Sequence, residues 1–259
     1  MMMTILAVIM VLTAVTVTVS VFSLLWRGST SDRERLTALV AGAVLALWAV
    51  AVIALARGGF FLAESDESIP PVGINLVLTL VLVAILVRAS ASLRGLLARP
   101  SSLVRLHAWR VVGVTFIVLA IAGRLPAVFA VPAGIGDILI GATTVWVAGD
   151  VETREGISRV KLWNWLGLAD LVLAISLGVM TNPGRLHFIR SVPSSEVMTQ
   201  FPMALVPAFL VPVAIATHVV SLLQLYRGTW PRAARRGRKE DRHVPAPHRL
   251  DGRPAGRGV

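Results

Sequence analysis

Cysteine is absent from the 259-residue chain, and lysine occurs only twice, as Lys161 and Lys239. Without a thiol the chain forms no disulfide and offers no nucleophilic cysteine, Cys-ligated zinc or iron–sulfur centre. A retinal Schiff base needs a lysine inside an apolar segment, whereas Lys161 flanks one and Lys239 lies near the carboxyl terminus. The sequence also lacks a Walker loop, a zinc-protease motif and a Gly-x-Ser-x-Gly elbow. These absences favour a protein that is not an enzyme, and we assign no catalytic residue.

Charged residues are scarce, at 15% of the chain, whereas hydrophobic residues make up 56% and the mean hydropathy is +0.77. Soluble domains carry about 25% charged residues. A water-soluble chain of this length could not cover so much apolar surface, but a bilayer accepts it. The net charge of +11 does not indicate nucleic acid, because the basic residues flank apolar runs or follow Tyr226. The composition predicts an all-α, multi-pass membrane bundle whose main partner is the lipid bilayer.

A membrane-spanning helix needs about 20 apolar residues, and seven stretches approach this length. They are residues 4–25, 36–56, 72–87, 108–123, 133–149, 162–180 and 203–225. The fourth and fifth stretches are short, so a re-entrant hairpin is the alternative to two full spans there. The first has neither a positive n-region nor a cleavage site, and we interpret it as a retained helix rather than a signal peptide. Residues 1–226 are thus expected to form one transmembrane domain.

The distribution of basic residues predicts the orientation of this domain. With the amino terminus outside, 21 of the 25 Lys and Arg residues fall on the cytoplasmic side, as the positive-inside rule requires. The carboxyl terminus is then cytoplasmic, and we expect a multi-pass protein of the plasma membrane. The tail, residues 227–259, is rich in Arg, Pro and Gly and is expected to be disordered. Its ten basic residues either contact anionic lipid headgroups or only enforce the topology.

Polar groups inside the predicted spans are the candidate functional residues, because burying them in a bilayer is costly. Asp137, Asp170 and His218 lie well inside apolar segments, and Asn164 lies near a cytoplasmic helix end. Arg124, at the outer end of the fourth span, is the expected ion-pair partner of Asp137.

Helical spacing places Asp170 on a stripe of small residues with Gly167, Ala174 and Gly178, so its side chain should face the bundle interior. His218 lies about as far into the bilayer from the cytoplasmic side as Asp170 does. We therefore predict a contact between Asp170 and His218, which would act as a proton relay or, alternatively, as a static hydrogen bond.

The last span contains Pro207 and Pro212, which should kink it. Each proline removes one backbone donor and so frees the carbonyl four residues earlier, at Met203 and Ala208. Exposed carbonyls of this kind occur where a helix lines a cavity and also where a helix merely bends.

No cofactor or metal is expected from the histidines. A membrane haem with two axial histidines needs both inside spans, and only His218 meets this condition. His107 and His187 are expected in loops.

The second half resembles a family of uncharacterised bacterial integral membrane proteins. The resemblance rests on three segments, residues 123–137 (GRLPAVFAVPAGIGD), 163–170 (WNWLGLAD) and 207–218 (PAFLVPVAIATH), and covers about residues 108–225. It implies a membrane location and no known activity.

Three functions fit these observations. The first is small-molecule or proton-coupled transport or permeation, along a path lined by Asp170 and His218, with Asp137 as a further candidate. The second is a membrane-embedded enzyme or accessory factor for a lipid-like substrate. The third is an interaction or sensor subunit that works through helix packing and its basic tail.

Overall fold

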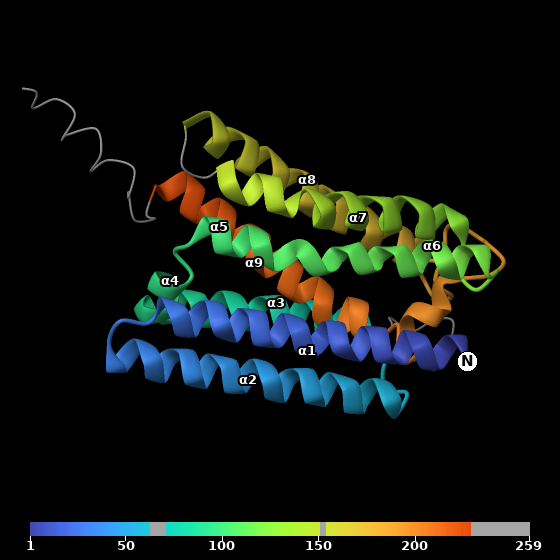
Figure 1. The fold of residues 1–259 in the computed structure, drawn as a ribbon. Helices are drawn as coiled ribbons and strands as arrows, with labels where there is room; N and C mark the ends of the chain where they lie inside the picture. Colours follow the sequence, from blue (N-terminus) through green and yellow to red (C-terminus); the bar gives the residue numbers. More distant parts are fainter. Residues whose placement is uncertain (63–70, 151–153, 229–259) are drawn as a thin grey trace, which may run out of the picture.

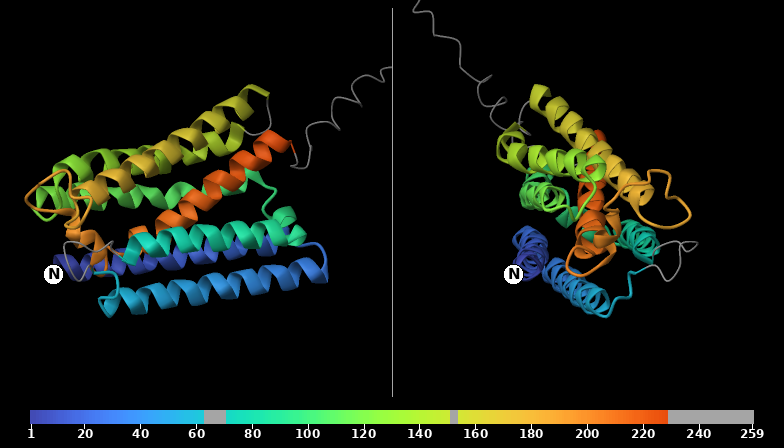
Figure 2. Two further views of the ribbon diagram at one scale, coloured as in Figure 1. Left: turned by 180° about the vertical axis from the view of Figure 1, so that it is seen from behind. Right: turned by 90° about the vertical axis from the view of Figure 1, so that its right-hand side faces the viewer.

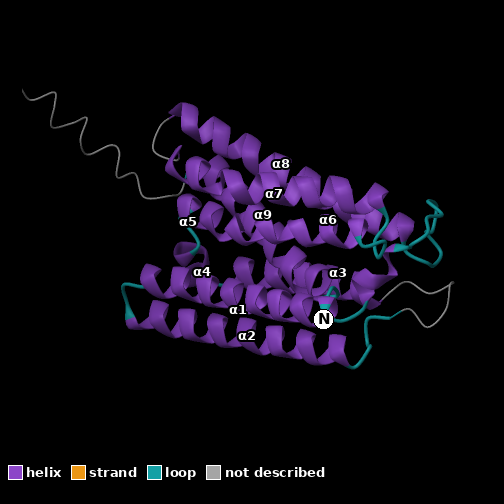
Figure 3. Ribbon diagram, turned by 45° about the vertical axis from the view of Figure 1, so that its right-hand side comes forward, coloured by secondary structure: helices purple, strands orange, loops and turns teal. Residues whose placement is uncertain are grey.

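The computed structural model describes residues 1–62, 71–150 and 154–228, so the predicted tail lies almost wholly outside the described residues. Within these ranges the protein consists of helices and loops, without a strand (Figure 3). Seven helices are long and apolar enough to cross a membrane. This agrees with the seven predicted spans. A helix is the natural form of such runs, because it satisfies every backbone polar group within the segment.

The seven long helices follow one another along the chain. They are α1 (Met2–Gly28), α2 (Asp32–Arg57), α3 (Pro71–Ala89), a continuous run of α5 (Pro100–Arg105), η1 (Leu106–Gly113) and α6 (Val114–Ile121), then α7 (Ala127–Gly149), α8 (Arg154–Thr181), and η4 (Val206–Leu210) continued by α9 (Val211–Arg227). The short α4 (Ala91–Leu96) and η3 (Ser195–Thr199) lie in the connections.

The fourth and fifth helices are longer than the sequence predicts. They run from Pro100 to Ile121 and from Ala127 to Gly149, so each has the length of a full span and the hairpin alternative is not what the structure shows. The prediction began the fourth span at residue 108 and placed His107 in a loop. His107 and Arg110 are both buried, and their polar groups are directed to the protein interior rather than to lipid.

The helices form two layers with α9 crossing between them (Figures 1 and 2). The helices α1, α2 and α3 form one layer, and α5 to α8 form the other. Residues 203–206 and 208–210, at the start of the crossing helix, are buried in the largest apolar core. We call the end of the bundle that holds Met1 the amino-terminal end, and the end at which α9 finishes the carboxy-terminal end.

The two prolines of the last span distort it. The segment Val206–Leu210 has π-helical hydrogen bonding, and Pro207 and Pro212 lie in it and just after it. Pro212 lacks the N–H that would bind the carbonyl of Ala208. The Asn75 Nδ2 of α3 donates to that carbonyl instead, at 2.8 Å. The predicted irregularity is therefore present, and a side chain from another helix satisfies the freed carbonyl.

Candidate functional site

Arg110 is the centre of a buried polar cluster at mid-span. Its side chain is fully buried, and its guanidinium binds three partners. The Nε donates to Asp137 Oδ1 at 2.6 Å, Nη2 donates to an oxygen of Asp170, and Nη1 lies 3.1 Å from His218 Nε2. The two carboxylate side chains are only 13% and 12% exposed. Four different helical segments, η1, α7, α8 and α9, thus meet at one guanidinium.

The hydrogen bonds fix the protonation state of His218 in this arrangement. An arginine can only donate, so His218 Nε2 accepts from Arg110 and carries no proton. His218 Nδ1 therefore carries the proton and donates to Asn164 Oδ1 at 2.9 Å. Asn164 in turn donates from Nδ2 to the carbonyl of Val160 at 2.8 Å. His218 is held as a neutral imidazole with one defined tautomer.

His107 extends the cluster toward the carboxy-terminal end. Its ring stacks on His218 with 3.8 Å between centroids, and Trp163 lies against both rings. The hydroxyl of Thr217 donates to backbone carbonyls of its own helix and accepts from His107 Nε2 at 3.0 Å. His107 Nδ1 is then the acceptor nitrogen, and it is buried with no partner among the described residues. A similar unpartnered atom, Ser221 Oγ, lies one turn beyond His218.

Glycines bring these helices close enough for the cluster to form. A Cβ at Gly113 would overlap the Cβ of Asp137, and a Cβ at Gly167 would overlap the ring of His218. The predicted small-residue stripe of α8 is therefore a close-packing surface, as such stripes are in membrane bundles.

The charges of the cluster do not balance. One guanidinium faces two carboxylates, while His218 is neutral. With both carboxylates ionised the group carries one net negative charge at mid-span. An uncompensated charge in such surroundings is strongly unfavourable.

One predicted pairing, that of Asp137 with Arg124, is wrong, and the other, that of Asp170 with His218, is indirect. Asp137 binds Arg110, whereas Arg124 is exposed at the amino-terminal end of the bundle, beyond α6. Arg124 had been chosen because it was the nearest cation at a span end. Asp170 and His218 do come together, but through Arg110, and no hydrogen bond of the described residues joins them directly.

Sequence reasoning missed two members of the cluster. Arg110 lies near the start of the predicted fourth span, where an arginine normally reaches the membrane surface, and His107 was expected in a loop. Their i, i+3 spacing in an apolar context was the available signal. With His107 inside a span, two histidines now meet the condition for a membrane haem. Their rings stack on each other, however, and so do not face a common iron. Among the described residues no group of three or more His, Asp or Glu is arranged to hold a metal.

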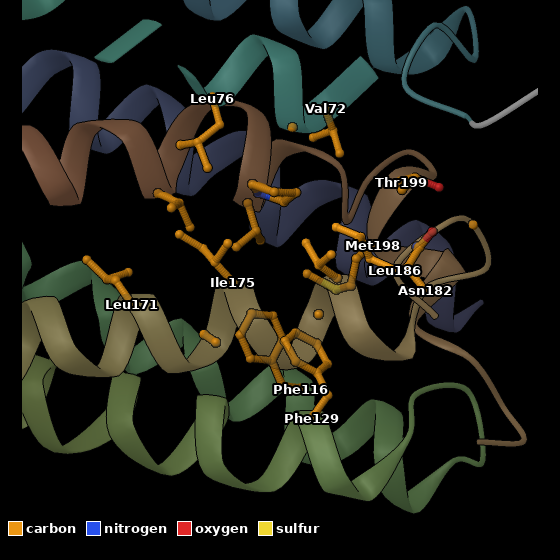
Figure 4. A pocket seen from close by; sticks show the side chains of 18 of the residues that line it. Val72, Leu76, Phe116, Phe129, Leu171, Ile175, Asn182, Leu186, Met198 and Thr199 are labelled. Atoms are coloured by element: carbon orange, nitrogen blue, oxygen red, sulfur yellow. The ribbon is translucent and has the colours of Figure 1, made fainter. Parts of the chain in front are cut away.

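A cavity of about 210 Å³ reaches the cluster from the amino-terminal end. It lies between α3 and α8, and Figure 4 shows Val72 and Leu76 approaching it from α3 and Ile175 from α8. Its walls are almost entirely aliphatic and aromatic. Asp137 lines it and is the one cluster residue that does.

The part of the chain that the structure describes is helical, and seven of its helices are long and apolar enough to cross a membrane. Residues 69–226 match the family described as a domain of unknown function, DUF8737, and because this is more than half of the chain, the chain belongs to that family. No curated protein and no solved structure matches the chain. The family region begins before α3 and includes the whole cluster and cavity, whereas α1 and α2 precede it.

Proposed function

We propose that this protein is a transporter that couples movement of a small molecule to proton binding at the Arg110 cluster. The observation that carries the proposal is the charge count, since Asp137 and Asp170 share one buried arginine. A single proton on either carboxyl group makes the cluster neutral. Proton binding also removes one of two competing ion pairs, so it changes which helix Arg110 holds most tightly. A proton thereby alters helix packing, which transport requires.

The two ends of the bundle differ in their access to the cluster. The cavity reaches Asp137 from the amino-terminal end. Between the two histidines, His107 and His218, and the carboxy-terminal end, the buried side chains are largely apolar. They include Leu103, Val104, Val160, Leu222 and Leu225. This asymmetry is expected of a transporter in one of its two states. The unpartnered His107 Nδ1 and Ser221 Oγ lie on the closed side, where polar groups would serve a path in the other state.

The proposed orientation places the amino-terminal end outside a plasma membrane. It rests on the distribution of basic residues in the sequence, most of which belong to segments that the predicted topology places on one side of the membrane, the side of the carboxy-terminal end. Arg110 is an exception, because it lies inside the bundle. In this orientation the cavity opens toward the outside and the closed side faces the cytoplasm.

The absence of native cysteine provides a direct test. Single cysteines are introduced at Thr199, which lines the cavity, and at Ser221, on the closed side. Their reaction rates with a membrane-impermeant maleimide are measured in open membranes at acidic and alkaline pH. Each rate is divided by that of a cysteine at Gly95, where a side chain meets no other atom within 4 Å, so that the pH dependence common to exposed thiols is removed.

Opposite pH dependence at the two positions is expected, one becoming more reactive as the other becomes less so. The variant Asp137→Asn should abolish it, because Arg110 and Asp170 then balance each other and the cluster no longer takes up a proton to become neutral. Equal rate ratios at both pH values, or the same pH dependence in the Asp137→Asn variant, would overturn the proposal.

A further inference from the structure

The cavity combines an apolar body with a single acidic end. Its walls include Phe116 and Phe129, whose rings lie 5.8 Å apart between centroids. Asp137 lines its inner part, and the polar residues Asn182 and Arg185 line it at the end of α8. An apolar cavity with one buried charged group selects ligands that carry a complementary charge on an otherwise apolar body.

Asp137 has capacity to bind a further group. Its Oδ1 accepts from Arg110, and no hydrogen bond of the described residues involves its Oδ2. The cluster to which it belongs carries one net negative charge when both carboxylates are ionised. A cation on Asp137 would restore neutrality in the same way as a proton does.

We propose that the cavity binds a small organic ammonium ion with an apolar body, which seats its charged nitrogen on Asp137 and displaces the proton of the cluster. This inference rests on the proposed function and names its substrate class. One positive charge enters and one leaves: the ammonium ion binds as R–NH₃⁺, and H⁺ is released to solvent. The net charge of the site is the same before and after, so neither state contains an uncompensated buried carboxylate. Exchange of a proton against a cation requires that only one of the two occupies the carboxylate at a time.

The size and lining of the cavity limit the body of the ligand. A closed apolar cavity of about 150 Å³ binds benzene, so 210 Å³ accommodates one aromatic ring with a short chain. The rings of Phe116 and Phe129 add favourable edge and face contacts for an aromatic ligand. These dimensions fit an arylalkyl amine.

An organic anion is the competing ligand, because Arg185 also lines the cavity. Arg185 is exposed, however, and an exposed charge is screened by water and salt. An anion that filled the cavity would also place its body beside a negatively charged cluster. The charge of the buried group therefore decides in favour of the cation.

The test compares three probes with the same phenyl group and different charge. They are 2-phenylethylammonium, the neutral 2-phenylethanol and the anion 3-phenylpropionate. Binding to the full-length protein in lipid nanodiscs is measured by titration calorimetry in two buffers of different ionisation enthalpy, which reports proton release. We expect 2-phenylethylammonium to bind at least about tenfold more tightly than either of the other probes. We also expect its binding to release a proton.

Three variants locate the site. Asp137→Asn should remove the preference for the ammonium ion while 2-phenylethanol still binds, which shows that the cavity remains intact. Ile175→Trp should block all three probes by filling the cavity. Val172→Trp, at a lipid-exposed position of the same helix, should leave binding unchanged.

Equal affinity for the ammonium ion and the alcohol, or tighter binding of 3-phenylpropionate, would overturn the assigned ligand class. That result leaves the proposed function intact if the cysteine reactivities still depend on pH. Selective binding of the ammonium ion without release of a proton would support an ammonium site in the cavity. It would overturn the exchange of the ammonium ion against a proton, and with it the proton coupling of the proposed function.

Discussion

Gly136 of α7 lies so close to Asp170 of α8 that a Cβ on the glycine would overlap the carboxylate oxygen Oδ1. The oxygen that would collide is not the one that binds Arg110, which is Oδ2. The absence of a side chain at Gly136 therefore allows the two helices to approach until Asp137 and Asp170 share one arginine. The net charge of the cluster depends on this approach.

Gly136→Ala should separate α7 from α8 or displace Asp170 from Arg110. Overpacking of this kind costs about 1–3 kcal/mol, so we expect a clear fall in Tm of the detergent-solubilised protein. The control is Gly149→Ala in the same helix, where a Cβ meets no atom within 4 Å. Equal Tm values for the two variants would show that the close approach is not required.

The charge count predicts opposite effects for two substitutions in the cluster. Asp137→Asn leaves one arginine with one carboxylate, so stability should be kept or raised. Arg110→Gln leaves two buried carboxylates without a cation and should cost about 3–5 kcal/mol. Thermal unfolding of both variants at neutral pH measures the difference. Adding Asp170→Asn to Arg110→Gln should recover part of the loss, and strictly additive losses would show that the two groups do not interact.

Asn75→Leu should loosen α3. The substitution removes the donor to the Ala208 carbonyl, which Pro212 has already deprived of its helical partner. A buried acceptor left unsatisfied costs about 1–3 kcal/mol. We expect amide exchange in α3 to become faster than in the unsubstituted protein, whereas exchange in α1 should not change. Ile74→Ala, which alters a lipid-exposed side chain of the same helix, should leave the exchange pattern unchanged.

Membrane topology is tested with single cysteines at the two ends of the bundle. A cysteine replacing Phe188, an exposed residue at the amino-terminal end, should react with impermeant maleimide in intact cells. A cysteine replacing Gly95 should react only after the membrane is opened. The reverse pattern would invert the proposed orientation.

The positions of the spans were largely predictable, because an apolar run of sufficient length leaves the backbone few alternatives to a helix in lipid. The candidates Asp137, Asp170, His218 and Asn164 were found for the same reason, since polar groups are conspicuous in such runs. All four meet in the structure, together with Arg110.

The pairing within the cluster could not be predicted from spacing along one helix. It depends on which faces of four helices meet. Glycines such as Gly113 and Gly167 determine these faces, and the residues that they contact lie far away in the sequence. Arg110 was misplaced because cations near span ends normally reach the headgroups. The sequence contains no local pattern that predicts the cavity, because the cavity is the space left between α3 and α8 by the packing of other elements.

The helix α3 is the shortest of the seven long helices that the structure describes, with 19 residues, and it contains no buried residue. At 1.5 Å per residue it is about 28 Å long, slightly less than the roughly 30 Å hydrocarbon thickness of a typical bilayer. In a thicker membrane this helix is the first of the seven to become too short, and the bilayer must thin around it, at a cost of a fraction of a kcal/mol per Å of mismatch. Because α3 also forms one wall of the cavity, the surrounding lipid exerts a mechanical force on the width of the binding site, and the protein is expected to respond to bilayer thickness.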